Sequence, residues 1–213
     1  VSESVFAAAF LARGMRSAAG RIEALSYWVA SDHFEELGRP KELLHGGFGL
    51  LTVGNLRKPR FYALALLERL GSDELAVSWS GDGAGSLVEA WAARDEAGRV
   101  TIAVWNGTLD QSKTAGDPLL DRRVSVEVNG LGAAAYTLRH YRVDVAHSNI
   151  AAVWERMRAA DAWPDEAGWR VLHDANRLEE LHPPQQVSAA DGRAQVEFEL
   201  PMPAVSLLEL GPG

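Results

Sequence analysis

Two segments near the start of the chain place their hydrophobic residues at helical spacing. In residues 4–19, Phe6 and Phe10 lie four positions apart on one face, and a glycine follows where a helix would end. Residues 59–70 begin with a proline, which suits the first turn of a helix, and their apolar stripe also stops at a glycine. The hydrophobic pattern therefore predicts two helices in residues 1–71.

Between these helices, residues 22–30 predict a strand of a particular kind. Their apolar residues do not alternate with polar ones, which is typical of a strand buried on both faces of a parallel sheet. Such a strand needs a neighbour along each edge to complete its hydrogen bonds. No other segment nearby has this pattern, so we expect polypeptide outside this sequence to complete the sheet.

Beyond residue 71 the pattern changes to short segments in which apolar and polar residues alternate. Turn sequences such as DEAG and ADG separate them, and together they predict an antiparallel β-sandwich. Residues 149–181 interrupt this pattern with an apolar stripe at helical spacing, which the pair Pro183-Pro184 closes. We therefore predict an α+β chain with two domains, residues 1–71 and 72–213, and a helical insertion in the second.

Composition and charge exclude several classes of function. The 213 residues carry a formal net charge of −8, whereas a protein that binds nucleic acid needs clustered Lys and Arg. The chain has no cysteine, which excludes disulfides, thiolate metal sites and cysteine nucleophiles. It has no apolar run of the roughly 20 residues that span a membrane. Its first residues lack the basic region and cleavage site of a signal peptide, so we expect a cytoplasmic location.

No motif in the sequence predicts a cofactor or a metal site. GDGAGS (residues 81–86) lacks the Lys-Ser/Thr ending of a phosphate loop and precedes a predicted strand, so we interpret it as a hairpin turn. His33 and His45 do not have the spacing that places two ligands on one helix face, and we predict hydrogen-bonded loop histidines instead. Asn106 begins the glycosylation sequon Asn-Gly-Thr, although nothing in the sequence indicates a secretory route.

The polar segment 31–58 is where we expect a functional site. It follows the predicted strand directly, and its length is unusual, because most connections between a strand and a helix take about 2–6 residues. In (β/α) barrels such loops form the active-site face. The candidate residues at its start are Trp28, Glu35 and Glu36.

The two adjacent glutamates indicate binding and not catalysis. A retaining glycosidase holds its two carboxyl groups about 5–5.5 Å apart on opposite sides of the scissile bond, which consecutive residues do not easily reach. Glu35 or Glu36 would instead accept hydrogen bonds from sugar hydroxyls while Trp28 packs on the sugar ring. The alternative is a core tryptophan beside two solvated glutamates. Spacing alone favours that alternative slightly, so the residues by themselves leave both interpretations open.

The motifs in combination resemble the end of the barrel in glycoside hydrolase family 39, which contains the β-xylosidases and the α-L-iduronidases. The resemblance rests on SYWVASDHFEELGRP (residues 26–40) and LHGGFGLLTVGNLRKPRFYALALLERLG (residues 44–71), whose elements follow in the family's order, and the β-xylosidase branch is the more similar. It implies that residues 22–30 are the eighth strand of a (β/α)8 barrel and residues 4–19 the helix after strand seven. The sandwich with a helical insertion is similar in layout too.

The resemblance also implies where the chemistry would lie. The family's retaining mechanism uses a glutamate after an Asn at the end of strand four as acid/base and a glutamate at the end of strand seven as nucleophile. Both would lie before Val1, so the chain would hold no catalytic residue and would be inactive alone. By resemblance, Trp28 would form a wall of the sugar site, and Glu35 and Glu36 would lie near the xylose hydroxyls, with Glu36 the stronger candidate.

The implied partners are the N-terminal barrel portion of the same enzyme and a xylose-containing oligosaccharide, and a homo-oligomer is left open. We expect no nucleic-acid or membrane partner. An iduronidase is one alternative, in which Arg39 and Lys41 would supply positive charge for a substrate carboxylate. The other is a stand-alone, non-catalytic β-sandwich module that binds carbohydrate or protein, with residues 1–70 as a helical cap.

Overall fold

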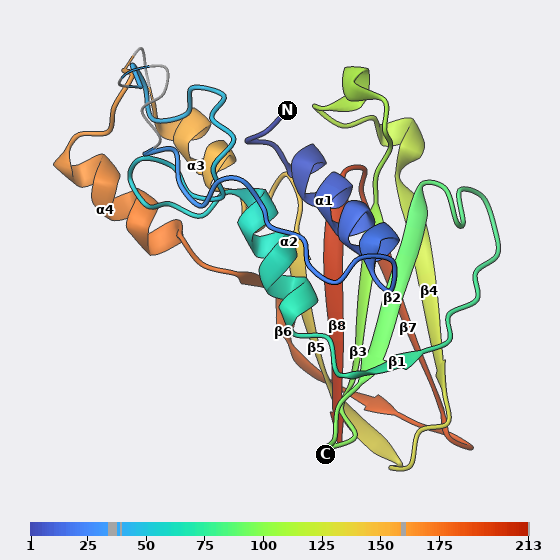
Figure 1. The fold of residues 1–213 in the computed structure, drawn as a ribbon. Helices are drawn as coiled ribbons and strands as arrows, with labels where there is room; N and C mark the ends of the chain where they lie inside the picture. Colours follow the sequence, from blue (N-terminus) through green and yellow to red (C-terminus); the bar gives the residue numbers. More distant parts are fainter. Residues whose placement is uncertain (34–37, 39, 159–160, 213) are drawn as a thin grey trace.

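The computed structural model describes residues 1–33, 38, 40–158 and 161–212, which combine helices with an antiparallel sheet (Figure 1). In chain order the elements are α1 (Val5–Ala18), α2 (Pro59–Glu68), β1 (Asp73–Leu75), β2 (Val88–Arg94), β3 (Val100–Asn106), two short 3-10 helices η1 (Gln111–Lys113) and η2 (Pro118–Leu120), β4 (Arg122–Asn129), β5 (Ala135–Val143), α3 (Ile150–Met157), α4 (Glu166–Ala175), β6 (Glu179–Ser188), β7 (Arg193–Leu200) and β8 (Ala204–Pro212).

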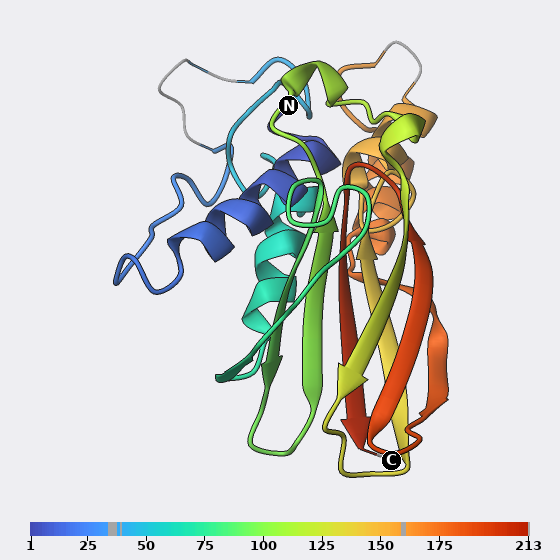
Figure 2. The ribbon, with the colours of Figure 1, turned by 90° about the vertical axis from the view of Figure 1, so that its right-hand side faces the viewer.

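Two antiparallel sheets form the predicted sandwich. The larger has six strands in the order β1-β2-β3-β8-β5-β6, and the smaller consists of β4 and β7. Alternate residues of the central strands point to opposite sides, so each face of the six-stranded sheet has its own core. One core lies between the two sheets, and α1 and α2 cover the other face (Figure 2).

Strand β3 shows why its sequence, VTIAVWN, has no polar face. Ile102 and Val104 contribute to the core between the sheets, whereas Ala103 and Trp105 pack under α1 and α2. Every residue of β3 is buried as a result. Burial of an apolar side chain of this size stabilises a fold by about 1.5–3 kcal/mol, so β3 contributes to both cores.

Both predicted helices are present, and small residues bring them close to the sheet. Ala8, Ala9 and Ala12 on α1 are buried against the sheet and α2. A methyl group added at Gly107 would lie 2.8 Å from the Cβ of Ala9, so the backbone after β3 approaches α1 closely. Arg13 adds an ion pair to Glu89 of β2 at 2.6 Å. None of the helices among the described residues is long and apolar enough to span a membrane.

The strand predicted at residues 22–30 does not form in this chain. These residues carry no strand assignment, and Ile22 and Leu25 are exposed. The nearest ladder contact is a single parallel bridge between Ser31 and Leu51. A strand requires a neighbouring strand along its edge, and none of the strands in the described part of the chain pairs with residues 22–28.

The helical insertion is confirmed, but it ends earlier than predicted. α3 and α4 lie within residues 149–181, yet β6 already begins at Glu179 and contains Pro183-Pro184. Prolines are tolerated there because β6 is the last strand of its sheet, where a missing N–H costs no ladder bond on the open side. The proposed domain division at residue 71 stays a prediction.

Candidate functional site

The structure describes one of the three predicted site residues. The side chain of Trp28 is 67% exposed, so it is not the core tryptophan of the alternative interpretation in this chain. The peptide bond between Trp28 and Val29 is cis. Glu35 and Glu36 lie outside the described residues, as does Arg39. The geometry of the sugar-binding glutamates therefore stays a prediction.

The chain after Trp28 runs beside a later part of the same segment. The amide of Leu50 donates to the carbonyl of Val29 at 3.1 Å, and the amide of Leu51 donates to that of Ala30 at 2.9 Å. The amide of Asp32 in turn donates to the carbonyl of Leu51 at 3.0 Å. Residues 29–32 and 50–51 are thereby held side by side.

A buried ion cluster lies at this junction. The ammonium group of Lys58 has no exposed surface and lies 2.5 Å from Asp32 Oδ2 and 3.2 Å from Glu3 Oε1. It also donates to the carbonyl of Gly47 at 2.8 Å. The ammonium group therefore donates hydrogen bonds to Glu3 and Gly47 and has the Asp32 carboxylate as its buried counter-charge, as a fully buried lysine requires. Removing one member of such a cluster leaves an uncompensated buried charge.

The glycines of the HGGFG motif allow this cluster to form. A Cβ at Gly47 would lie 2.5 Å from the carboxyl carbon of Asp32, and one at Gly49 would lie 2.5 Å from the Asp32 amide nitrogen. The amide of Gly49 donates to Asp32 Oδ1 at 2.8 Å. The motif thus brings its backbone against Asp32, which no other residue type would allow.

Arg60 extends the cluster to the residue before Trp28. Its guanidinium donates to the carbonyl of Gly47 at 2.9 Å and to the hydroxyl of Tyr27. Tyr27 donates that hydroxyl to the carbonyl of Phe48 at 3.0 Å. The side chain that precedes Trp28 is therefore held from two sides, whereas Trp28 itself faces outward.

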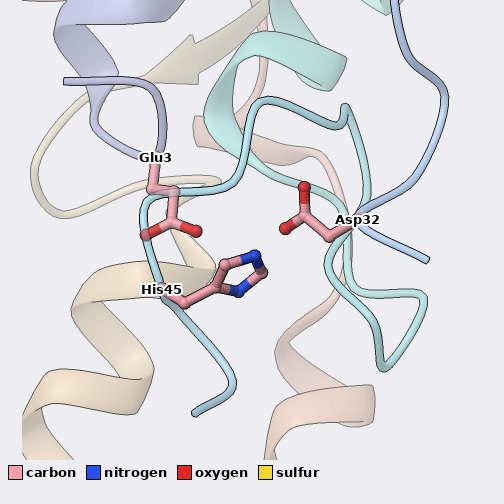
Figure 3. A group of neighbouring side chains, drawn as sticks. All are labelled: Glu3, Asp32 and His45. Carbon is pink, nitrogen blue, oxygen red and sulfur yellow. The ribbon is translucent and has the colours of Figure 1, made fainter. Parts of the chain in front are cut away.

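The same place offers three ligand atoms of the kind that bind metals. Glu3, Asp32 and His45 lie with one ligand atom each within 4.8 Å of one another (Figure 3). Lys58 already forms ion pairs with both carboxylates, and a metal ion would have to displace that buried positive charge. We therefore interpret the group as a structural ion cluster. His33 is apart from it and bonds through Nδ1 to Ser31 Oγ at 2.7 Å.

The helical insertion packs against the same polar segment. Leu43 and Leu56 of the segment share a buried cluster with Ile150, Trp154 and Leu172. The Leu43 amide donates to the carbonyl of Ala162, and the Trp163 indole donates to the carbonyl of Lys41, both at 2.9 Å. The insertion therefore packs directly against the segment.

Two other polar groups are structural. The Nδ2 group of Asn106 donates to the carbonyls of Leu120 and Leu200, so the sequon asparagine is buried and occupied. His140 lies 3.0 Å from Ser206, but both are fully buried, and burial lowers the pKa of His140 to about 3. A pair without access to solvent cannot act on a substrate.

Sequence reasoning did not single out Glu3, Asp32 or Lys58 as members of one cluster. A signal was present for two of them, since Ser31-Asp32 and Lys58-Pro59 are elements on which the family resemblance rests, whereas Glu3 lies outside these motifs. The contacts between them join positions far apart in the sequence, and hydrophobic periodicity carries no information on such contacts.

Comparisons with known proteins give a consistent result along the chain. The sequence model of "Glycosyl hydrolases family 39" matches residues 1–190. A β-xylosidase from Geobacillus stearothermophilus is 28% identical over 210 residues, which are 99% of this chain and 38% of that protein. The chain therefore spans well under half the length of this relative.

Solved structures agree in fold. A GH39 enzyme from Xanthomonas axonopodis pv. citri matches with a TM-score of 0.80 at 24% identity, over 100% of this chain and 42% of that chain. A monomeric β-xylosidase from Caulobacter crescentus CB15 matches with a TM-score of 0.78 at 25% identity, over 99% of this chain and 42% of that chain. In both cases, more than half of the longer chain lies outside the matched region.

Proposed function

The chain belongs to glycosyl hydrolase family 39, and we propose that it is the C-terminal portion of a retaining β-xylosidase that releases xylose from xylo-oligosaccharides. The observation that carries this proposal is the match along 99% of the chain to a β-xylosidase of which it covers 38%. In this proposal residues 1–71 complete a (β/α)8 barrel, and the sandwich supports it.

The exposed surface of residues 1–58 is consistent with a further polypeptide packing against it. Several large apolar residues of this part of the chain are exposed: Val1, Phe10, Ile22, Leu25, Trp28 and Phe48. Exposed large apolar residues are typical of an interface when they form part of one surface. The remaining barrel would supply strands on both sides of residues 22–30 and bury these side chains.

Within the complete enzyme, this chain would bind the sugar and the rest would cleave it. We assign Trp28 to a wall of the sugar site and Glu35 and Glu36 to its hydroxyls, with Glu36 the stronger candidate. Hydrogen bonds to sugar hydroxyls that tighten as the oxocarbenium-like transition state forms lower the barrier by several kcal/mol. The ion cluster around Lys58 would fix the backbone that carries these groups.

Hydrolysis of an aryl β-xyloside tests the proposal. The 213-residue chain alone should give no turnover above buffer, and adding the rest of the barrel as a second polypeptide should restore it. In the restored enzyme, Glu36→Gln should lower kcat/KM by at least about tenfold, because one charge-assisted hydrogen bond contributes about 1.5–3 kcal/mol. Glu166→Gln, on the exposed side of α4, is the matched control and should leave kcat/KM unchanged.

Three outcomes would contradict the proposal. Turnover by the chain alone that Glu36→Gln removes would place a catalytic carboxylate in this chain. A monomeric chain that binds xylo-oligosaccharide by itself, with residues 22–30 protected, would favour the stand-alone module. Restored activity on iduronides in place of xylosides would favour the iduronidase alternative, with Arg39 and Lys41 as the residues to test next.

A further inference from the structure

The chain contains two Asn-Gly pairs, Asn106-Gly107 and Asn129-Gly130, which lie in opposite environments. In such a pair the backbone nitrogen of the glycine can attack the side-chain amide of the asparagine, because glycine has no Cβ to hinder the approach and its backbone is flexible. This reaction is one reason why asparagine is a thermolabile residue. Which of the two pairs reacts therefore depends on whether the fold leaves the attack possible.

Asn106-Gly107 is protected at each of the groups that would take part. Asn106 has no exposed surface, and its Nδ2 group donates to the carbonyls of Leu120 at 2.9 Å and Leu200 at 3.0 Å. The amide of Gly107 donates to the carbonyl of Leu87 at 3.0 Å. An attack would break these bonds and rotate the backbone inside a packed interior, so the pair reacts only when this part of the fold opens.

Asn129-Gly130 lies at the surface. Asn129 is the last residue of β4 and is exposed on the outer face of the smaller sheet, and the exposed Gly130 follows it with a φ of +72°. The ladder between β4 and β7 ends with Asn129 and Arg193. The Nδ2 group of Asn129 donates to Glu127 Oε1 at 3.0 Å, in a contact that is exposed to water. An exposed bond at the end of a strand opens readily, which lets the side chain turn toward the glycine nitrogen.

We propose that Asn129 is a site of spontaneous deamidation. The Gly130 nitrogen forms a bond to Cγ of Asn129 while the bond between Cγ and Nδ2 breaks, and ammonia leaves with the proton of the Gly130 amide. The product is a cyclic succinimide. Water then opens the ring at either carbonyl and gives aspartate or isoaspartate, in which the main chain passes through the side-chain carbon. The inference does not depend on the proposed function, since water is the sole co-reactant.

The new carboxylate changes the charges on the outer face of β4. Asn129 donates a hydrogen bond to Glu127, whereas a carboxylate at this position only accepts, so two negative charges would replace one hydrogen bond. Arg193 lies opposite on β7 and supplies a positive charge on the same face. Aspartate should therefore be tolerated, and the formal net charge of −8 becomes more negative by one.

Isoaspartate should have the larger effect, because it adds a carbon atom to the main chain just before a fixed loop. The amide of the buried Leu131 donates to the carbonyl of Gly192 at 3.0 Å. The amides of Gly132 and Ala133 donate to the hydroxyl of Tyr136, both at 3.2 Å. The added atom displaces these donors from their acceptors, so the loop that leads into β5 should loosen.

Incubation of the folded 213-residue chain at mildly alkaline pH tests the inference, since the attacking nitrogen must lose its proton. Peptide mass spectrometry measures the conversion of each asparagine. We expect Asn129 to convert on the order of 100-fold faster than Asn106, because Asn106 reacts only from an opened form. In urea, where the chain is unfolded, both should convert at similar rates. Conversion of Asn129 no faster than that of Asn106 in the folded chain would overturn the proposal.

Two variants provide a matched control, read by isoelectric focusing of the acidic species that accumulates. Asn129→Gln moves the amide one methylene away from the Gly130 nitrogen and should prevent most of this species from forming. Asn55→Gln changes another exposed asparagine, which a leucine follows, and should leave its accumulation unchanged. If the acidic species accumulates equally in Asn129→Gln, it comes from another residue and the proposal fails.

Asn129→Asp separates the effect of the charge from that of the added carbon atom. Amides 131–133 should exchange at nearly the original rate in Asn129→Asp and at least about tenfold faster in the isolated isoaspartate form. Equal exchange in the two forms would overturn the predicted effect on the loop. The Asp-Gly pairs at 82–83 and 191–192 do not interfere, because their isomerisation changes neither mass nor charge.

Discussion

Two tryptophans show how differently the sandwich and residues 22–30 are buried by the rest of the chain. Trp105 on β3 has no exposed surface, and its indole donates to Glu89 at 3.1 Å, whereas the side chain of Trp28 is 67% exposed. Both lie in continuous apolar stretches. β3 has β2 and β8 along its edges and a layer on each face, while residues 22–28 have no strand partner in the described part of the chain. An apolar pattern leads to burial only when the elements that cover it are present.

Substitution of the two tryptophans is the largest test of this contrast. Trp105→Ala should lower the free energy of unfolding of the 213-residue chain by about 3–5 kcal/mol, because it leaves a cavity under α1. Trp28→Ala should change it by less than about 1 kcal/mol. Urea unfolding followed by far-UV circular dichroism measures both values. Similar losses for the two variants would mean that residues 22–30 are packed in solution.

The sequence predicts the fold well where the covering elements lie within the chain and poorly where they do not. The helices and the sandwich strands are confirmed, because each buries its apolar face within the chain. The strand predicted at residues 22–30 does not form, because no strand of the described residues lies beside it. The end of the helical insertion was wrong because prolines were taken as a stop signal, whereas Pro183 and Pro184 lie in an edge strand that accepts them.

The candidate site was predictable only in outline. The sequence predicted it at Trp28 and in the polar segment 31–58. That Asp32 and Lys58 meet in a buried ion pair depends on the path of the whole segment, which periodicity does not encode. The placement of Glu35 and Glu36 stays a prediction.

Lys58→Met is the next largest test, because it breaks the buried ion cluster of Glu3, Asp32 and Lys58. The substitution leaves the carboxylates of Asp32 and Glu3 without their buried counter-charge, which should cost about 3 kcal/mol. The loss should be local, so amides at positions 30–32 and 50–51 should exchange faster while those of β3 and β8 do not. Hydrogen exchange with mass spectrometry separates the two sets.

The matched control is Lys113→Met, which breaks an ion pair of the same 2.5 Å length with Asp117. Lys113 is partly exposed, so water replaces its partner and the exchange of residues 30–51 should not change. Uniform acceleration of exchange over the whole chain by Lys58→Met would mean that the ion cluster stabilises the sandwich as well.

Acid should weaken the sandwich through His140. Burial lowers the pKa of this histidine to about 3, against about 6.5 in an unfolded chain. The unfolded state therefore binds the proton first, and stability is lost as pH falls from about 6.5 toward 3. Between pH 7 and pH 5 the free energy of unfolding should fall by about 2 kcal/mol. The reason is that pH 5 lies about 1.5 units below the pKa of an unfolded histidine, and each unit contributes about 1.36 kcal/mol.

His140→Asn isolates this contribution. It keeps a polar group beside Ser206 and Phe198 without a titrating proton, so its free energy of unfolding should be nearly flat between pH 7 and pH 5. His45→Asn, at an exposed position, should keep the pH dependence of the free energy of unfolding seen in the original chain. An unchanged slope in His140→Asn would show that another group causes the acid sensitivity.

Gly14→Ala has the smallest expected effect, and it tests the solvent-exposed side of α1, on which Gly14 lies. Gly14 is exposed within the helix, and an added Cβ meets no atom within 4 Å outside the helix backbone. The isolated chain should gain about 0.5–1 kcal/mol, since alanine has the higher helix propensity. Gly107→Ala is the control and should destabilise, because its Cβ would lie 2.8 Å from that of Ala9. If Gly14→Ala stabilises the chain but weakens its association with the rest of the barrel, then the open side of α1 is the surface on which that barrel packs.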